Sequence, residues 1–152
     1  MFELTSATID INGGRARLTN SRAGALATFE GIVRNHNEGL SVTSLEYEAY
    51  GELALKEGQR ILQEAKASFD IIDCCCVHRT GHLSVGDIAV WVGVTAVHRH
   101  QALSACQFII DAVKARVPIW KKEHYESSDS GWINCSHGCS QGMEAVGGKR
   151  HK

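Results

Sequence analysis

The chain has 152 residues, of which 43% are apolar and 22% are charged, and its formal net charge is −1. These values are typical of one globular domain with its own core. A net charge so close to zero gives no support for a nucleic-acid binder, so any anion site must be a local cluster of cations. No apolar run approaches the ~18 residues that span a bilayer, and the N-terminus lacks the features of a signal peptide. We therefore expect a cytoplasmic protein whose six cysteines are free thiols and which binds neither nucleic acid nor membranes.

The first part of the chain predicts strands. Phe2 and Leu4 can begin an edge strand, and the polar residues 10–22 form either a short helix or a loop. Residues 25–35 and 42–50 are two predicted strands, the second with clear alternation of side chains. The connection between them is rich in Asn and Gly, which favours a hairpin.

The middle and end of the chain alternate between helix and strand patterns. Residues 51–69 carry apolar side chains at i, i+3 and i+4 spacing, which predicts a helix that covers a sheet. Residues 70–83 and 87–97 are predicted as a second strand pair. The second of these is almost continuously apolar, so we expect a central strand buried on both faces. Residues 119–127 predict a further strand.

The stretch from His98 to Glu123 organises the second half of the protein. It begins as an amphipathic helix that ends near Pro118, the only proline in the chain. Lys114 lies at the edge of the apolar face of this helix, where its stem can pack and its amine can reach a boundary. The apolar face itself contains Ala102, Ala105, Cys106, Ile109, Ala112, Val113 and Val117.

Cations lie at both ends of this helix, and each group allows two interpretations. His98 and His100 are either metal ligands or neighbours of an anion site at Arg99, and we favour the anion site because helix N-termini attract anions. Lys121 and Lys122 are either a solvated charge pair or part of a site in which a desolvated lysine acts as nucleophile or acid–base group.

The pattern of the cysteines favours packing in the core over metal binding or catalysis. On a strand, the outer two residues of Cys74–Cys76 point one way and the middle one the other, so they cannot jointly bind a metal. Cys106 lies on the apolar helix face. A Cys-Ser-His-Gly-Cys run at 135–139 offers three ligands without an evident fourth, which gives zinc little support. We expect one domain, residues 1–134, followed by a flexible tail, residues 135–152.

Several motifs follow one another in a recognisable order. They are Thr28–Asn37 (TFEGIVRNHN), Leu45–Tyr50 (LEYEAY), Val77–Gly81 (VHRTG), Val85–Asp87 (VGD), Ala96–Arg99 (AVHR) and Lys114–Glu123 (KARVPIWKKE). Together they resemble the large, catalytic subunit family of molybdopterin synthase, from about residue 2 to Trp132. No single motif would carry the resemblance. The Cys-Ser-His-Gly-Cys segment departs from the family pattern, so Lys149 and Arg150 in the tail are not assigned to a site.

The resemblance implies an α+β fold of the α/β-hammerhead type, with antiparallel strands and two main helices. It implies a homodimer that forms a heterotetramer with a small ubiquitin-like sulfur carrier, which ends in a Gly-Gly thiocarboxylate. The implied reaction places two sulfurs on cyclic pyranopterin monophosphate and so forms the dithiolene of molybdopterin. The resemblance implies no metal and no organic cofactor for the large subunit.

The resemblance also implies site residues. Lys114 and Lys121 match the two active-site lysines and are the catalytic candidates. Phe29 and Arg34 would contact the tail of the carrier. The substrate-binding candidates are Ile32, Val33, Arg34, His98, Arg99, Lys114, Lys121, Lys122 and Glu123. The residue types suit the chemistry, because arginine binds phosphate in a fork and lysine stabilises an oxyanion or moves a proton.

Helix geometry adds a hypothesis to the resemblance. Arg99 and Lys114 are fifteen positions apart on one helix, which is ~22 Å at 1.5 Å per residue. One small pterin cannot contact both within one chain, so we expect an active site shared across a homodimer. Two alternatives to the enzyme remain open from the sequence: a scaffold that binds the carrier without chemistry, and a small metal-binding protein that uses the tail.

Overall fold

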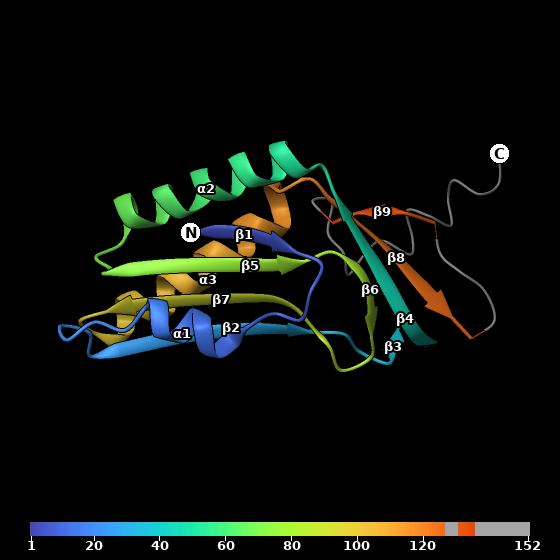
Figure 1. Cartoon of the computed structure of the whole chain (residues 1–152), viewed down its shortest axis with the longest axis horizontal. Coiled ribbons are helices and arrows are strands. Elements are labelled where there is room, and N and C mark those ends of the chain that lie inside the picture. Colours follow the sequence, from blue (N-terminus) through green and yellow to red (C-terminus); the bar gives the residue numbers. More distant parts are fainter. Residues whose placement is uncertain (127–130, 136–152) are drawn as a thin grey trace.

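The computed structural model describes residues 1–126 and 131–135, which form two β-sheets side by side with helices packed on the first (Figure 1). The first sheet contains, in spatial order, β1 (Phe2–Thr5), β5 (Asp73–Arg79), β7 (Ile88–Ala96) and β2 (Ala25–Ile32). The β1–β5 pair is parallel, and the other two pairs are antiparallel. The predicted α+β class and the predicted edge strand at Phe2 are confirmed.

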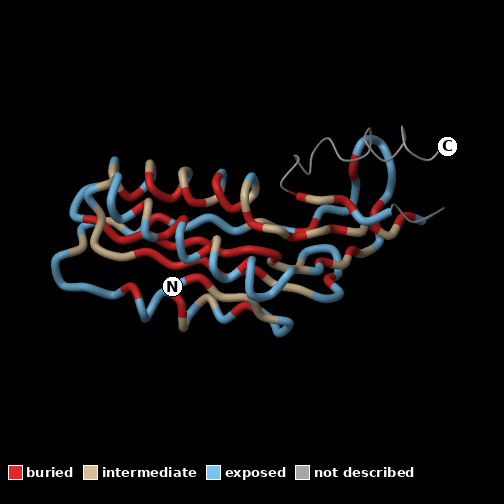
Figure 2. Tube along the Cα trace, turned by 90° about the horizontal axis from the view of Figure 1, so that it is seen from above, coloured by how far each residue is buried: buried red, intermediate tan, exposed pale blue. Residues whose placement is uncertain are grey.

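Helices cover both faces of this sheet. α2 (Gly51–Ser68) and α3 (Arg99–Arg116) pack on one face, and the short helix α1 (Ile11–Arg17) lies on the other (Figure 1). In the view of Figure 2, buried residues follow the strands and the inward turns of the helices. Strand β7 is buried along nearly its whole length, as its continuous apolar run predicted.

The three adjacent cysteines divide between the two faces. Cys74 and Cys76 belong to the core beneath α2 and α3. Cys75 packs with Trp91 in the smaller cluster on the α1 side. This alternation confirms that the run is strand core, because successive strand side chains point to opposite faces.

Helix α3 has the boundaries and the face that its sequence predicted. Its N-cap is His98, and its C-cap Val117 adopts an extended conformation before Pro118. The buried residues within it are Ala102, Ala105, Cys106, Ile109, Ala112 and Val113.

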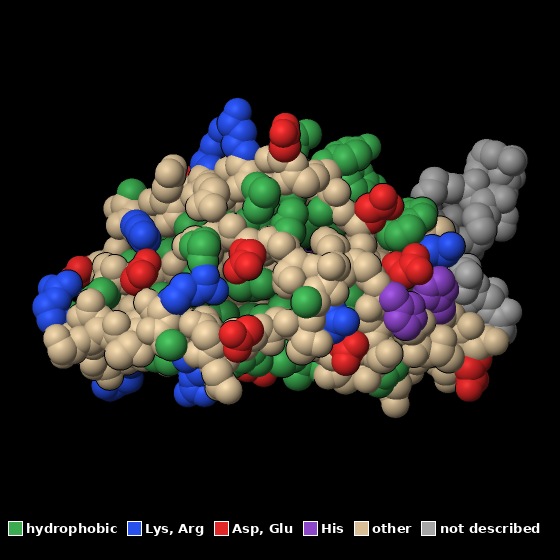
Figure 3. All heavy atoms as spheres, viewed as in Figure 1, with side chains coloured by type: hydrophobic (Ala, Val, Ile, Leu, Met, Phe, Trp, Pro, Cys, Tyr) green, Lys and Arg blue, Asp and Glu red, His purple; other side chains and the backbone are tan. Residues whose placement is uncertain are grey.

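The second sheet is antiparallel and lies beyond the end of the first (Figure 1). It contains, in order, β3 (His36–Asn37), β4 (Leu40–Ala49), β8 (Ile119–Tyr125) and β9 (Ile133–Asn134), and β6 (Gly81–Ser84) also pairs with β4. Its outer face carries His82 and His124, whose ring centroids are 6.4 Å apart. Figure 3 shows histidines on this part of the surface, and charges of both signs interspersed over the face in view.

One predicted strand pairing is wrong, and a second is confirmed only in part. Residues 25–35 and 42–50 do not form a hairpin, because β2 pairs with β7 and belongs to the first sheet. The hairpin is the shorter pair β3–β4, and its two turn residues, Glu38 and Gly39, have φ values of 52° and 81°. Positive φ at both central positions is the geometry of a tight turn that matches strand twist.

The predicted pair of 70–83 with 87–97 is confirmed for β5, which pairs with β7. Residues 70–83 nevertheless contain two strands that belong to different sheets. β5 ends at Arg79, and the chain turns at Gly81, where φ is 87°. From there β6 pairs with β4 instead of β7. Local periodicity indicates strand and face, but the choice of partner depends on contacts far along the chain.

No helix within the described residues is long and apolar enough to cross a membrane. The cytoplasmic location expected from the sequence stays a prediction.

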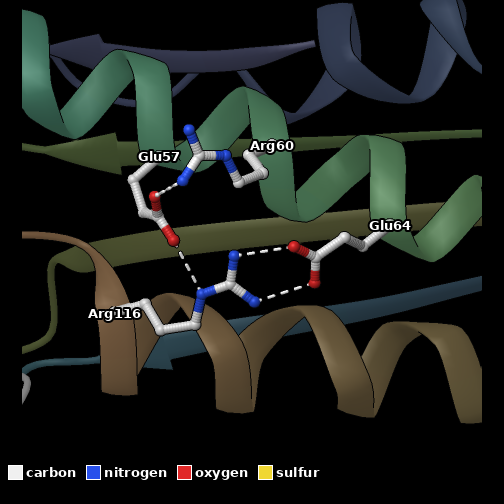
Figure 4. Close-up of polar contacts among 4 residues, drawn as sticks. All are labelled: Glu57, Arg60, Glu64 and Arg116. Atoms are coloured by element: carbon white, nitrogen blue, oxygen red, sulfur yellow. Dashed lines mark hydrogen bonds and ion pairs between the residues drawn. The ribbon is translucent and has the colours of Figure 1, made fainter.

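An ion-pair network joins the two long helices (Figure 4). Arg116 of α3 forms a bidentate pair with Glu64 of α2, at 2.8 and 2.9 Å, and its Nε lies 2.7 Å from Glu57 Oε2. Arg60 also contacts Glu57, at 3.2 Å. The hydrogen bond from Arg116 holds the pKa of Glu64 below its ordinary value, and the bond from Glu64 raises the pKa of Arg116.

We expect Arg116→Ala to lower the melting temperature by about 2–4 °C near neutral pH, because an exposed network of this kind stabilises modestly. The pKa of Glu64 is lower in the folded state, so this stabilisation is present above its ordinary value of 4.5 and is lost as the pH falls. Thermal melts at pH 7 and pH 3.5 measure both effects. Arg60→Ala, which removes a single contact within α2, is the control and should change little at either pH.

Candidate active site

A cavity of about 400 Å³ lies where the two sheets meet. It is formed by the end of β2 and the residues after it, the start of β7, the last turn of α3, and strands β4 and β8. The described residues that line it are Gly31, Ile32, Val33, Arg34, His36, Leu45, Tyr47, Ala89, Val90, Lys114, Lys121 and Glu123. Its lining combines apolar side chains with three basic ones, Arg34, Lys114 and Lys121.

Strand alternation places a charged pair on the inner face of β8. Lys121 and Glu123 are only 7% and 4% exposed, and Tyr125 is buried beside them. Lys121 Nζ lies 3.2 Å from Glu123 Oε2. A buried ammonium requires such a partner, because desolvation of an isolated charge is costly.

The Glu123 carboxylate is held by further donors. Asn37 Nδ2 donates to Glu123 Oε1 at 3.0 Å, and the Tyr125 hydroxyl donates to the same oxygen. Burial alone would raise the pKa of Glu123, but the Tyr125 hydrogen bond, the charge of Lys121 and the Asn37 hydrogen bond outweigh it, so the pKa lies below its ordinary value. Glu123 is therefore a carboxylate at neutral pH.

The remaining cations of the cavity come from other elements. Lys114 is half-buried near the end of α3, at the edge of the apolar face, as predicted. Arg34 follows β2, and its Nη2 donates to Asn37 Oδ1 at 3.4 Å. Among the described residues that line the cavity, Arg34, Lys114 and Lys121 are basic and Glu123 is acidic. This balance favours an anionic ligand.

A buried histidine supports the wall of the cavity. The ring of His78 meets that of Tyr47 edge-on, with centroids 4.9 Å apart. Burial lowers the pKa of His78 to about 4, and the charge of Lys114 acts in the same direction. His78 is thus neutral at pH 7, so it adds no further charge next to the cavity.

The structure brings six of the predicted site residues to this cavity and places four elsewhere. Ile32, Val33, Arg34, Lys114, Lys121 and Glu123 line it, whereas Phe29, His98, Arg99 and Lys122 do not. His98 and Arg99 are exposed at the opposite end of α3. Phe29 is 39% exposed on β2. Lys122 lies on the other face of β8, with Nζ 5.9 Å from the ring centroid of Trp132.

The residues at 4–116 match the family model described as MoaE protein. The chain belongs to the MoaE protein family. A relative from Thermoplasma volcanium, named molybdopterin synthase catalytic subunit, is 41% identical over 116 residues, which cover 76% of this chain and 85% of the relative.

Solved structures agree with this membership. The crystal structure of molybdopterin synthase from Staphylococcus aureus has a TM-score of 0.82 and 36% identity, and covers 86% of this chain and 95% of its own. A complex of subunits 1 and 2 of molybdopterin-converting factor from Helicobacter pylori has a TM-score of 0.70, with 84% and 87% coverage. At 19% identity, the latter shows a shared fold alone.

Sequence reasoning missed three residues around the site of this MoaE-family chain: Asn37, Tyr47 and Tyr125. Asn37 fell in a segment interpreted as a connection, although it lies inside a strand and is only 5% exposed. For Tyr125 a signal was available, because it follows Lys121 and Glu123 at strand spacing and so shares their face.

The cysteines and histidines do not form a second site among the described residues. Within residues 1–126 and 131–135, no group of three or more His, Cys, Asp or Glu side chains is placed to hold a metal ion. Cys135 is buried in the core. His137 and Cys139 of the predicted tail motif, and Lys149 and Arg150, lie outside the described residues.

We expect the strand and helix cysteines to resist alkylation in the native protein. Burial raises the pKa of both Cys74 and Cys106 to about 11, so little thiolate exists at pH 7.5. Iodoacetamide labelling resolved by peptide mass spectrometry should leave both unmodified for hours, and should modify both rapidly in 6 M guanidinium. Rapid labelling of the native protein would contradict this burial.

Proposed function

We propose that this chain is the catalytic subunit of a molybdopterin synthase, a sulfurtransferase that converts cyclic pyranopterin monophosphate to molybdopterin. The observation that carries the proposal is the cavity between the two sheets, whose lining includes Lys114, Lys121 and Arg34 together with apolar side chains. The membership of a family whose curated relatives bear this name supports the same assignment.

The proposed sulfur donor is a small ubiquitin-like carrier with a C-terminal Gly-Gly thiocarboxylate. The related Helicobacter pylori structure is a complex of two subunits of a molybdopterin-converting factor. By analogy, the tail of the carrier enters the cavity beside Arg34, and Phe29, exposed on the neighbouring strand, contacts the tail on its way in.

The cavity can bind the two parts of the substrate on different walls. The pterin ring packs against the apolar side, which includes Leu45, Tyr47 and Val90. The phosphate takes the cationic side, where Arg34 can offer a fork of donors. Ile32 and Val33 contribute mainly backbone, and Glu123 orients Lys121 through the 3.2 Å ion pair.

The proposed chemistry uses lysine as an electrostatic and proton-transfer group. The thiocarboxylate sulfur attacks a substrate carbon and forms a C–S bond, while a C–O bond at that carbon breaks and its electron pair stays on the leaving oxygen. The ammonium of Lys121 or Lys114 stabilises that oxygen and can protonate it. Water then cleaves the acyl–sulfur bond, the carrier leaves as a carboxylate, and the sulfur stays on the substrate. A second carrier supplies the second sulfur.

The proposed site is completed by a second copy of the chain. His98 and Arg99 begin α3, whereas Lys114 lies near its end and lines the cavity. In a homodimer that brings the start of one α3 to the cavity of the partner, the partner would supply His98 and Arg99 for the phosphate, with Lys122 at the rim. Two chains with two carriers then form a heterotetramer.

We expect Lys121→Ala to reduce the conversion of cyclic pyranopterin monophosphate by at least about 100-fold, since it removes a preorganised cation from the reacting centre. The assay mixes purified chain, thiocarboxylated carrier and substrate, and detects molybdopterin as its oxidised fluorescent product. Lys56→Ala, on the exposed face of α2, is the matched control. Undiminished turnover by Lys121→Ala would refute its catalytic role.

The same assay separates the enzyme from a scaffold. If the wild-type chain forms a complex with the carrier but yields no product, the scaffold alternative holds. Carrier binding by Lys121→Ala, measured by calorimetry, shows whether its loss of turnover comes from the chemistry or from lost assembly.

We expect mixed dimers of an Arg99→Ala chain and a Lys121→Ala chain to recover about half of the wild-type activity, because one of their two shared sites is intact. Two different affinity tags isolate the mixed dimer, and each parental homodimer serves as the inactive control. If the mixed dimer is as inactive as the two parental homodimers, each complete site lies within one chain.

A further inference from the structure

We propose that Asn37 is a positioning residue of the active site, which ties Arg34 to the Glu123–Lys121 pair across the cavity. The inference deepens the proposed function and rests on it for the identity of the substrate. Asn37 does not line the cavity itself, so it acts through the residues that do.

The hairpin turn puts Asn37 in its place. Asn37 is the last residue of β3 and pairs with Leu40 across the two-residue turn of Glu38 and Gly39. Both turn residues have positive φ, so the turn is tight and the strand end is well defined. The side chain of Asn37 is consequently buried between the hairpin and β8, with 5% of the residue exposed.

The hydrogen bonds of Asn37 with Arg34 and Glu123 determine the orientation of its amide, and Asn37 also forms a side-chain hydrogen bond with Tyr125. The Arg34 guanidinium only donates, so the oxygen of Asn37 accepts from it, at 3.4 Å. The Glu123 carboxylate only accepts, so the nitrogen of Asn37 donates to it, at 3.0 Å. A side chain that offers one donor and one acceptor is what this position needs. Leucine offers neither, and aspartate offers only acceptors.

This arrangement does more than satisfy a buried polar group. Arg34 is an exposed residue on a long side chain, and tethering it to a buried amide reduces the conformational freedom lost when it binds an anion. At the other end, the Asn37 N–H stabilises the charged form of Glu123, which in turn holds Lys121. One side chain thus sets the position of two cations that come from different parts of the chain.

The experiment compares Asn37→Leu with Tyr125→Phe. Both variants remove a donor from the same oxygen of Glu123, and Tyr125→Phe also removes a hydrogen-bond partner of Asn37. Only Asn37→Leu removes the acceptor that Arg34 uses. Several charged or titratable groups near Glu123 can contribute to the pH dependence of the rate. They include Arg34, His36, Glu38, Lys114, Lys121 and Tyr125.

For Asn37→Leu, we expect the KM for cyclic pyranopterin monophosphate to rise by about threefold to tenfold, the range for a modest hydrogen bond to a charged group. We also expect the acidic limb of the pH–rate profile to move up by about one pH unit, since Glu123 loses a donor that favours its charged form. Tyr125→Phe should move the acidic limb in the same direction with little change in KM. Ser41→Ala, exposed on the same hairpin, is the control.

Asn37→Asp gives a further test at the same position. It keeps the acceptor for Arg34, so KM should rise less than in Asn37→Leu. It replaces the donor to Glu123 by a second carboxylate, so the acidic limb should move further up. If Asn37→Leu loses thermal stability and kcat but keeps the wild-type KM and pH profile, its role is structural and the proposal is overturned.

A measurement without turnover separates this inference from the proposed function. The chemical shift of the Glu123 carboxyl carbon is followed by NMR as a function of pH in the wild type and in Asn37→Leu. This signal reports on Glu123 alone and so separates its titration from that of His36. A higher pKa of Glu123 in the variant supports the positioning role even if the wild-type chain shows no sulfur transfer. An unchanged titration overturns it, whatever the activity.

Discussion

The candidate active site depends on one buried ion pair. Lys121 and Glu123 lie two residues apart on β8 and face the same cavity, with their charged atoms 3.2 Å apart. Neither charge could be buried alone at an acceptable free energy, and the pair becomes tolerable because Asn37 and Tyr125 donate further hydrogen bonds to the carboxylate. The pair thereby keeps the amine of Lys121 away from bulk water. Away from water, the interaction of a charged amine with an anionic ligand is stronger.

Both sheets contribute to the cavity that this ion pair faces. The first sheet has helices on both faces and supplies a rigid frame, and the second is attached at its end (Figure 1). The cavity lies at the junction and takes side chains from β2, β4, β7, β8 and α3. The network around Arg116 adds to this frame, because Arg116 is two residues from Lys114 and fastens the same turn of α3 to α2 (Figure 4). Helix packing and site geometry are thus linked.

Several features of the fold could be predicted because they depend on local periodicity. The apolar face of α3, its end at Pro118, the buried strand β7 and the division of the three cysteines all follow from which residues share a side of a helix or strand. Pairing partners could not be predicted in the same way. β2 and β4 are neighbours in sequence, yet they belong to different sheets, because β2 is apolar on the side that completes the core beneath α3.

The residues of the candidate site could likewise be predicted only in part from the sequence. Motif resemblance named Arg34, Lys114, Lys121 and Glu123 before any geometry was available, and the spacing along α3 separated Arg99 from Lys114. Asn37 ends the first of the resemblance motifs, but the motif gave it no role, since its role depends on contacts with Arg34, three residues away, and with Glu123, 86 residues away.

By itself, the sequence determined the residue chemistry, the helices, most strand positions and the faces that turn inward, because these depend on propensities and spacing within a short segment. Only the tertiary structure decided which strands pair, where Gly81 sends the chain from one sheet to the other, and which buried amide links the cations of the cavity. Those features depend on hydrogen bonds and packing between distant segments, and no local pattern encodes which distant group will be the partner.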